Sequence, residues 1–336
     1  MRLVMKNKLL PIVLIIFTLS LGQNGIFAAN KKLAQSGFKF LSVGTDARGG
    51  ALVDAVTTVE MGSSSLFFNP SGMARLAKRF EVSLSQNNWI ADIKHNAFSL
   101  AINPYGGKYG VIGLSFMSID YGNVQGTMVW GNDQGFVDTE ILKPMAFAAG
   151  LGYAKALSDK FSVGGQMKIT GQYLGKSMVP VGDDSLEVKR NQAILTAFDF
   201  GTMFRTGYKS LIFGMSVRNF SNEIKYERES FQLPLTFRIG LSMNVLDLLD
   251  IKSGLMSCLA TIDAVHSRDY PEQIKVGLEY KLLDMFCLRA GFMAPSDEQH
   301  YAFGFGIQKF GAAIDYAYTP FGIFDNVQRI TFRFVL

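Results

Sequence analysis

Residues 235–243 read LTFRIGLSM, a stretch in which apolar and polar residues alternate without a break. One face would carry the apolar side chains of Leu235, Phe237, Ile239, Leu241 and Met243. The other face would carry threonine, arginine, glycine and serine. Because successive side chains of a β-strand point to opposite sides, this stretch predicts a strand with one apolar and one polar face.

The same alternation recurs along most of the chain, for example at residues 274–281 and 330–336. About fourteen such runs follow from Phe80, beginning near residues 80, 93, 109, 144, 160, 191, 209, 234, 251, 272, 284, 299, 310 and 328. An even number of antiparallel strands is typical of bacterial single-chain barrels. We therefore predict an all-β fold, a transmembrane antiparallel β-barrel of about fourteen strands.

The composition agrees with a barrel in a membrane. Hydrophobic residues make up 48% of the chain and there are 34 glycines, yet no apolar run after residue 30 is long enough for a transmembrane helix. Barrel strands need only one apolar face, so the hydrophobicity of such a chain is spread thinly. The net charge of +5 comes from scattered Lys and Arg, which argues against a nucleic-acid partner.

Short and long links alternate between the predicted strands. The short links span residues 103–108, 157–160, 206–209, 246–250, 281–284 and 309–310, and the longer ones span 120–143, 172–190, 219–233, 266–271, 294–298 and 319–327. Only the link near residues 88–91 breaks the rule. Outer-membrane barrels have short periplasmic turns and longer outer loops. The alternation therefore predicts that both ends of the chain lie on the periplasmic side.

The first 29 residues have the pattern of a cleaved signal peptide. Arg2, Lys6 and Lys8 precede an apolar core at residues 9–21, and small residues follow at 28–29. We expect three parts: a signal peptide at 1–29, an N-terminal periplasmic segment and plug at 30–79, and the barrel at 80–336. The expected location is the outer membrane, with its lipid as the surroundings of the barrel.

Between the signal and the barrel lies the stretch VGTDARGGALVDAVTTVEMGSSSLFFNPSGMARL, residues 43–76. It is rich in small residues, follows neither helical nor strand periodicity for long, and closes on a turn signal around Asn69 and Pro70. A flexible linker is one interpretation. The other is a compact plug inside the barrel, whose motif residues are Asp46, Arg48, Gly49, Gly50, Asn69, Pro70 and Gly72.

Residues 46–51 (DARGGA) and 65–74 (SLFFNPSGMA) resemble the N-terminal signature of the PorV/PorQ family of outer-membrane proteins, with Ser71 where the family usually has Ala. That family is in turn similar to the FadL-type transporters of hydrophobic compounds, whose N-terminal hatch carries an Asn-Pro-Ala motif. Further similar stretches follow in order, at residues 151–165, 218–220, 233–240, 262–265, 276–280, 288–291 and 315–322.

The resemblance implies one main function, a component of protein secretion, and one alternative, a transporter. A PorV-like protein would be a non-enzymatic component of type IX secretion, binding the secretion translocon or the C-terminal domains of secreted cargo through its outer links. A FadL-like protein would pass a hydrophobic small molecule through the plugged lumen. The transporter alternative predicts an apolar cavity beside Phe67, Phe68 and Met73, whereas the secretion alternative predicts a filled lumen.

Charged residues on the predicted strands must point into the lumen or lie near an interface, because charge facing lipid is costly. The candidates are Lys168, Asp199, Arg218, Arg238, Asp263, Glu279, Arg289, Asp315 and Arg333. We expect them to form ion pairs and to hold the plug through Asp46, Arg48, Asp54 and Glu60. Guiding a substrate is the alternative role.

The sequence offers no pattern of an enzyme or a cofactor site. No nucleophile elbow and no metal-ligand spacing is found, so we predict no catalytic residue, no metal and no cofactor. The three histidines, His95, His266 and His300, fall in or near predicted outer links and are expected to be solvated. Cys258 and Cys287 are predicted on strands that are not neighbours, which disfavours a disulfide.

Overall fold

The computed structural model describes residues 36–180, 186–225, 230–250 and 254–336. The predicted signal peptide at 1–29 lies outside these residues. Within them, fourteen antiparallel strands form a closed barrel. The strands are β1 (Phe80–Asn88), β2 (Lys94–Ile102), β3 (Val111–Asp120), β6 (Met145–Ala156), β7 (Phe161–Pro180), β8 (Leu186–Arg205), β9 (Ile212–Phe220), β12 (Thr236–Asn244), β13 (Met256–Ser267), β14 (Gln273–Leu282), β15 (Phe286–Ala294), β16 (Tyr301–Lys309), β17 (Ala312–Thr319) and β18 (Val327–Val335).

The predicted fold class and strand number are thus confirmed. The barrel closes where β1 pairs with β18, with Leu84 opposite Phe332. Most strands begin within three residues of the expected position, and β8 and β13 differ by five residues, in opposite directions. No helix in the described part of the chain is long and apolar enough to span a membrane.

The two faces of the wall have the predicted composition. On β12, Ile239 and Leu241 are exposed on the outside, whereas Arg238 and Ser242 are buried on the inside. The same division holds on β3, where Leu114 and Phe116 are exposed outward. A pleated strand alternates its side chains between faces, so the period of two in the sequence becomes an apolar exterior and a mainly polar interior.

The N-terminal segment, residues 36–79, lies against the inner face of the wall. It contains short helices, η1 (Lys39–Ser42), α2 (Ala47–Ala51), η2 (Gly62–Phe67) and η3 (Pro70–Met73). Capping explains two of them: Asp46 accepts a hydrogen bond from the Gly49 backbone NH at the start of α2, and Asn69 accepts one from the Ser71 NH at the start of η3.

Glycines of the wall allow the segment to pack closely. A Cβ at Gly164 of β7 would lie 2.5 Å from backbone atoms of Pro70 and Ser71. A Cβ at Gly291 of β15 would lie 2.8 Å from backbone atoms of Leu52 and Val53. Since real side chains essentially never approach this closely, glycine is required where the segment crosses these strands.

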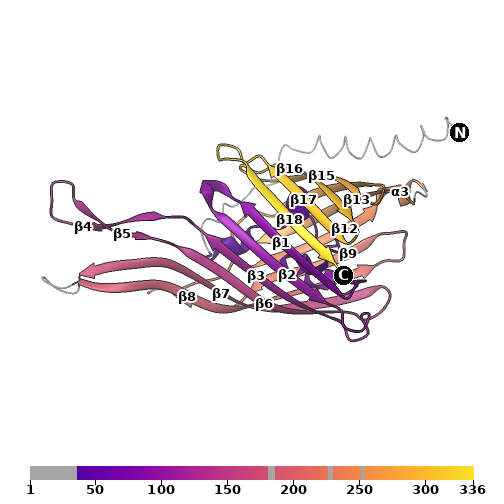
Figure 1. Cartoon of the computed structure of the whole chain (residues 1–336), viewed down its shortest axis with the longest axis horizontal. Helices are drawn as coiled ribbons and strands as arrows, with labels where there is room; N and C mark the ends of the chain where they lie inside the picture. Colours follow the sequence, from indigo (N-terminus) through magenta and orange to yellow (C-terminus); the bar gives the residue numbers. More distant parts are fainter. Residues whose placement is uncertain (1–35, 181–185, 226–229, 251–253) are drawn as a thin grey trace.

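The long links contain more strand than expected. Residues 120–143 hold the hairpin of β4 (Val124–Val129) and β5 (Phe136–Leu142), and the link between β9 and β12 holds β10 (Ile224–Lys225) and β11 (Ser230–Phe231). Residues 172–180 and 186–190 belong to strands and not to a loop, because β7 and β8 continue past the end of β6, whose Met145 pairs with Tyr173. Figure 1 shows the β4–β5 and β7–β8 hairpins extending beyond the rest of the barrel at one end.

The remaining elements, η4 (Ile90–Asp92) and α3 (Val245–Leu248), are single turns.

The position of the segment corrects the expected topology. Phe80 and Leu336 do meet at the end of the barrel with the short links, where the Phe80 NH donates to the Leu336 carbonyl. Ser36, however, bridges Gln232 in the link between β9 and β12, and Lys39 pairs with Asp269 in the link between β13 and β14. The described segment therefore starts at the long-link end, opposite to the end expected.

Candidate functional site

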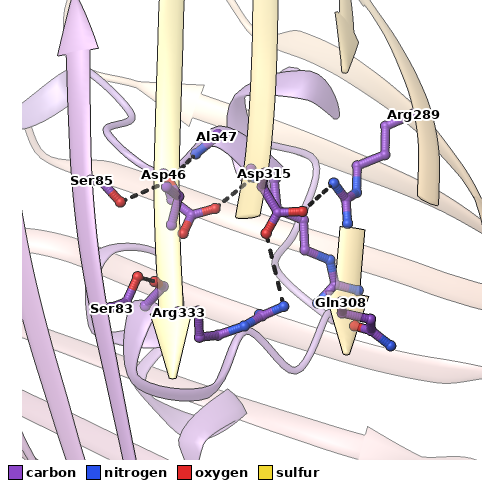
Figure 2. A network of polar contacts seen from close by, with 12 residues as sticks. Asp46, Ala47, Ser83, Ser85, Arg289, Gln308, Asp315 and Arg333 are labelled. Carbon is purple, nitrogen blue, oxygen red and sulfur yellow. Dashed lines mark hydrogen bonds and ion pairs between the residues drawn. The ribbon is translucent and has the colours of Figure 1, made fainter. Parts of the chain in front are cut away.

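An ion-pair network joins the N-terminal segment to the wall near the short-link end. Arg48 donates two hydrogen bonds of 2.7 Å to the two carboxylate oxygens of Glu279. Arg289 donates to Glu279 and to Asp315, at 2.6 Å each, and Arg333 lies 3.9 Å from the other oxygen of Asp315. Figure 2 shows Asp315 between Arg289 and Arg333. The predicted lumen charges are therefore paired here.

Arg48 is held charged by this network. Burial lowers the pKa of its guanidinium, but Glu279, with smaller contributions from Asp315 and Asp46, outweighs burial and raises the pKa above its usual range. A largely buried ion pair of this geometry fixes the position of the segment, because removal of Glu279 would leave the Arg48 charge uncompensated.

The other predicted lumen charges contact different partners. Lys168 donates to both oxygens of Asp199, at 2.9 and 2.7 Å, and to Asn219. Asp263 accepts from the backbone NH and the hydroxyl of Thr57. Wall and segment are thus connected by uncharged groups as well as by ion pairs.

The predicted plug charges have mixed roles. Glu60 pairs with Arg205, whereas the Asp46 carboxylate caps α2. Asp54 accepts a hydrogen bond from Arg238 at its backbone carbonyl, at 2.9 Å, and not at its side chain.

The Asn69-Pro70 motif anchors the last part of the segment. Asn69 donates to the Thr57 carbonyl at 2.6 Å and to the Thr202 carbonyl of β8 at 3.3 Å, and its Oδ1 accepts from Ser71. Pro70 is the first residue of η3, and Gly72 leaves room for Ser65. In α2, Gly49 packs against the Phe68 ring and Gly50 against Arg329.

The interior beside Phe68 and Met73 is filled. Phe68 packs with Leu52, Val56 and Met61, and Met73 packs with Leu66 and inner residues of the wall. The apolar cavity that a transporter was expected to have at this level is therefore occupied by side chains.

An apolar area of the inner wall lies instead toward the long-link end. We define the inner apolar patch as the inward-facing residues Met117 and Ile119 of β3, Ala146 and Ala148 of β6, and Ala193 and Ala197 of β8. Phe38, Phe40 and Leu41 of the segment cover it, and all three are 3% exposed or less. The patch and these three residues belong to a cluster that has more buried members than the other apolar clusters of the described interior.

Sequence reasoning missed both this patch and two wall cations. Lys275 and Arg329 are buried and point inward. Each lies an even number of residues from a predicted lumen charge on the same strand, Lys275 from Glu279 and Arg329 from Arg333. Alternation along a strand would therefore have placed both cations on the inner face. His95 corrects another expectation, because it is 2% exposed and packs beside Trp89 instead of being solvated. Cys258 and Cys287 are free thiols, on strands separated by β14.

No family model matches the chain, and no curated protein matches it either. The comparison with solved structures does find relatives in fold. The toluene transporter TbuX of Ralstonia pickettii superimposes with a TM-score of 0.59 at 12% identity, covering 87% of this chain and 98% of TbuX. The CymD monoaromatic hydrocarbon channel superimposes with a TM-score of 0.60 at 10% identity, covering 88% of this chain and 98% of CymD.

A FadL homologue of Pseudomonas aeruginosa gives a TM-score of 0.51 at 13% identity, covering 87% of this chain and 98% of that protein. At such identities the likeness concerns the fold: the chain has the architecture of these FadL-type proteins over nearly its whole described length. The comparisons give no support to the predicted PorV/PorQ membership.

Proposed function

We propose that this protein is an outer-membrane channel that admits hydrophobic small molecules, as the FadL-like alternative expects. The observation that carries the proposal is the inner apolar patch, because an apolar area on the inner wall of a barrel is suited to a hydrophobic ligand. The likeness to a toluene transporter and a monoaromatic hydrocarbon channel supports the same class of cargo.

The outer surface supports a membrane location. Exposed apolar side chains cover the outside of the strands, including Leu114, Leu241, Leu278 and Phe303. An apolar outer band is what lipid requires of a barrel. With the export signal expected at residues 1–29, the outer membrane is the proposed location and its lipid the proposed surroundings.

The N-terminal segment would act as the plug. It fills the barrel beside Phe68 and Met73 and covers the inner apolar patch with Phe38 and Phe40. A hydrophobic molecule that enters from the long-link end would replace these aromatic rings on the patch. Passage through the barrel would then require the segment to shift, since its core at Leu66 and Met73 is closely packed.

The binding step can be tested with 4-fluorotoluene and the purified protein in lipid nanodiscs, followed by fluorine NMR. We expect saturable binding that strengthens in the variant Phe38→Ala, which removes a competing ring. Ile119→Asn should abolish binding and Ile119→Leu should retain it. If neither the wild type nor Phe38→Ala shows saturable binding, the proposal is wrong.

Binding of a secretion partner is a second candidate, and one observation favours it. The β4–β5 hairpin extends from the barrel and exposes Val129, Trp130 and Ile141, and exposed apolar groups of this kind often contact a protein. A variant without residues 124–142 should lose co-purifying secreted proteins if this role is real. Unchanged co-purification, or none from the wild type, would remove the candidate.

A further inference from the structure

Four buried cations gather at one level of the barrel interior. Each is the third residue from the long-link end of its strand, and none is more than 8% exposed. We name them the outer cation cluster: Arg218 of β9, Arg238 of β12, Lys275 of β14 and Arg329 of β18. Burying so many like charges is costly unless anions compensate them.

Few anions are available for this compensation. Asp263 lies between Arg238 and Lys275 in strand order, but its Oδ2 already accepts two hydrogen bonds from Thr57. Asp199 near Arg218 is paired with Lys168, and Asp46 near Arg329 caps α2. The remaining carboxylate is Asp54, which belongs to the N-terminal segment. The side chain of Lys275 makes no hydrogen bond or ion pair within the described residues and interacts with Asp54 and Asp263 only at longer range. The cluster therefore carries an excess of positive charge.

Asp54 is the counter-ion that the N-terminal segment brings to the cluster. Its burial opposes ionisation, but the four cations together outweigh burial and lower the pKa of its carboxyl. Its Oδ1 has no hydrogen-bond partner among the described residues, and neither has the Nε of Arg218 or of Arg238. The carboxylate compensates charge here without making the directed hydrogen bonds that guanidinium groups normally give to a carboxylate.

The backbone at Asp54 is strained. Val53 and Asp54 have φ angles of 48° and 60°, which are unfavourable for a β-branched residue above all. Hydrogen bonds hold the turn, from the Asp54 NH to the Gly49 carbonyl at 2.8 Å and from Arg238 to the Asp54 carbonyl. Strain of this kind persists only where the surroundings impose it, so these contacts hold the turn, and with it the Asp54 carboxylate, beside the cluster.

The cluster also adjoins the residues that cover the inner apolar patch. Arg218 lies 3.5 Å from the Leu41 carbonyl, and Leu41 packs on the patch. Arg329 donates to the Gly44 carbonyl, and a Cβ at Gly44 would overlap the Asp54 carboxylate. A cationic site and an apolar site are thus neighbours, both filled by one short piece of the chain.

We propose that the outer cation cluster is a binding site for the carboxylate of a small organic acid, and that Asp54 holds this site until such an acid replaces it. The proposal goes beyond the passage of uncharged hydrophobes. The apolar part of the acid would lie on the inner apolar patch, and its carboxylate would accept the hydrogen bonds that Asp54 leaves unmade. Replacement of Asp54 would also release the strained turn.

The protein contains a reporter for the test. Trp89 lies over Arg329, with 5.6 Å between the guanidinium carbon and the ring centre, and Trp130 is the other of its two tryptophans. In a Trp130→Phe background, Trp89 fluorescence would be followed while the detergent-purified protein is titrated with benzoate or with benzyl alcohol, its uncharged counterpart.

We expect Asp54→Asn to lower the half-saturating benzoate concentration about tenfold, the effect of one charge-assisted hydrogen bond. The same variant should leave the half-saturating concentration of benzyl alcohol unchanged. The double variant Asp54→Asn, Lys275→Gln should lose the tighter binding of benzoate. Lys275→Gln alone, which keeps Asp54, should weaken benzoate binding, so the test holds even if Asp54→Asn does not fold.

The proposal would be overturned if the protein with Asp54 and the Asp54→Asn variant bound benzoate at the same half-saturating concentration. It would also be overturned if Asp54→Asn tightened the binding of benzyl alcohol as much as that of benzoate. The channel proposal has separate evidence, because it fails only if uncharged aromatics do not bind. Benzyl alcohol binding without any preference for benzoate in Asp54→Asn would reject the carboxylate site alone.

Discussion

Arg48 of the N-terminal segment and Glu279 of β14 form a two-pronged ion pair, with both hydrogen bonds at 2.7 Å. The two residues are 231 positions apart in the chain. Glu279 is also bound by Arg289, so one carboxylate serves two guanidinium groups. This contact ties the segment to the wall and leads to the first prediction.

Replacing Glu279 should destabilise the protein more than replacing Arg48. Glu279→Ala leaves the largely buried Arg48 without its carboxylate and Arg289 with Asp315 alone, a cost of about 3–5 kcal/mol, whereas Arg48→Ala leaves Glu279 still paired with Arg289. Urea unfolding of the detergent-purified protein measures the free energy of unfolding of both variants. Equal losses, or a smaller loss for Glu279→Ala, would contradict the shared-carboxylate interpretation.

Asn69→Ala should lower the free energy of unfolding of the same protein by about 1–3 kcal/mol, because the Thr57 and Thr202 carbonyls lose a donor and η3 loses its cap. Asn69→Asp should cost at least as much. It keeps the cap but removes both donated hydrogen bonds and buries a charge. A neutral effect of Asn69→Asp would show that the donated bonds are unimportant.

Gly164→Val should displace the segment from the wall, since even a Cβ at Gly164 overlaps backbone atoms of Pro70 and Ser71. The adjacent Gly165→Val is a matched control: a Cβ there would lie 3.5 Å from the Phe200 ring, an ordinary contact. We expect Gly164→Val alone to raise the conductance of single channels in planar bilayers and to expose the segment to protease. Equal behaviour of the two variants would argue against a plug.

Leu241→Arg tests the outer face of the barrel. Leu241 is near the middle of β12 and is 43% exposed, so in a membrane it would face lipid, where arginine costs about 2–4 kcal/mol. Leu241→Phe should be nearly neutral. Refolding into lipid vesicles, followed by denaturant titration, measures both variants. If Leu241→Arg matches Leu241→Phe, this face does not contact lipid.

Period-two patterning was enough to predict the barrel, because each strand of a barrel wall repeats the same local rule. The alternation at Leu235–Met243 specified a strand and the direction of each side chain, and similar runs gave all fourteen strands. The caps Asp46 and Asn69 are also local features, since a cap bonds to residues two or three positions away, although the sequence analysis named these residues only as part of the plug motif.

Contacts between distant parts of the chain could not be predicted in this way. No local sequence pattern indicates that Arg48 pairs with Glu279, that Ser36 lies at the long-link end, or that Asp54 lies among four cations. Each of these contacts depends on how the segment crosses the barrel. The length of β7 and β8 was missed for a related reason, because the two strands pair with each other beyond the end of β6. The sequence by itself therefore determined the wall and its two faces, while the tertiary structure alone decided which inward side chains the N-terminal segment meets.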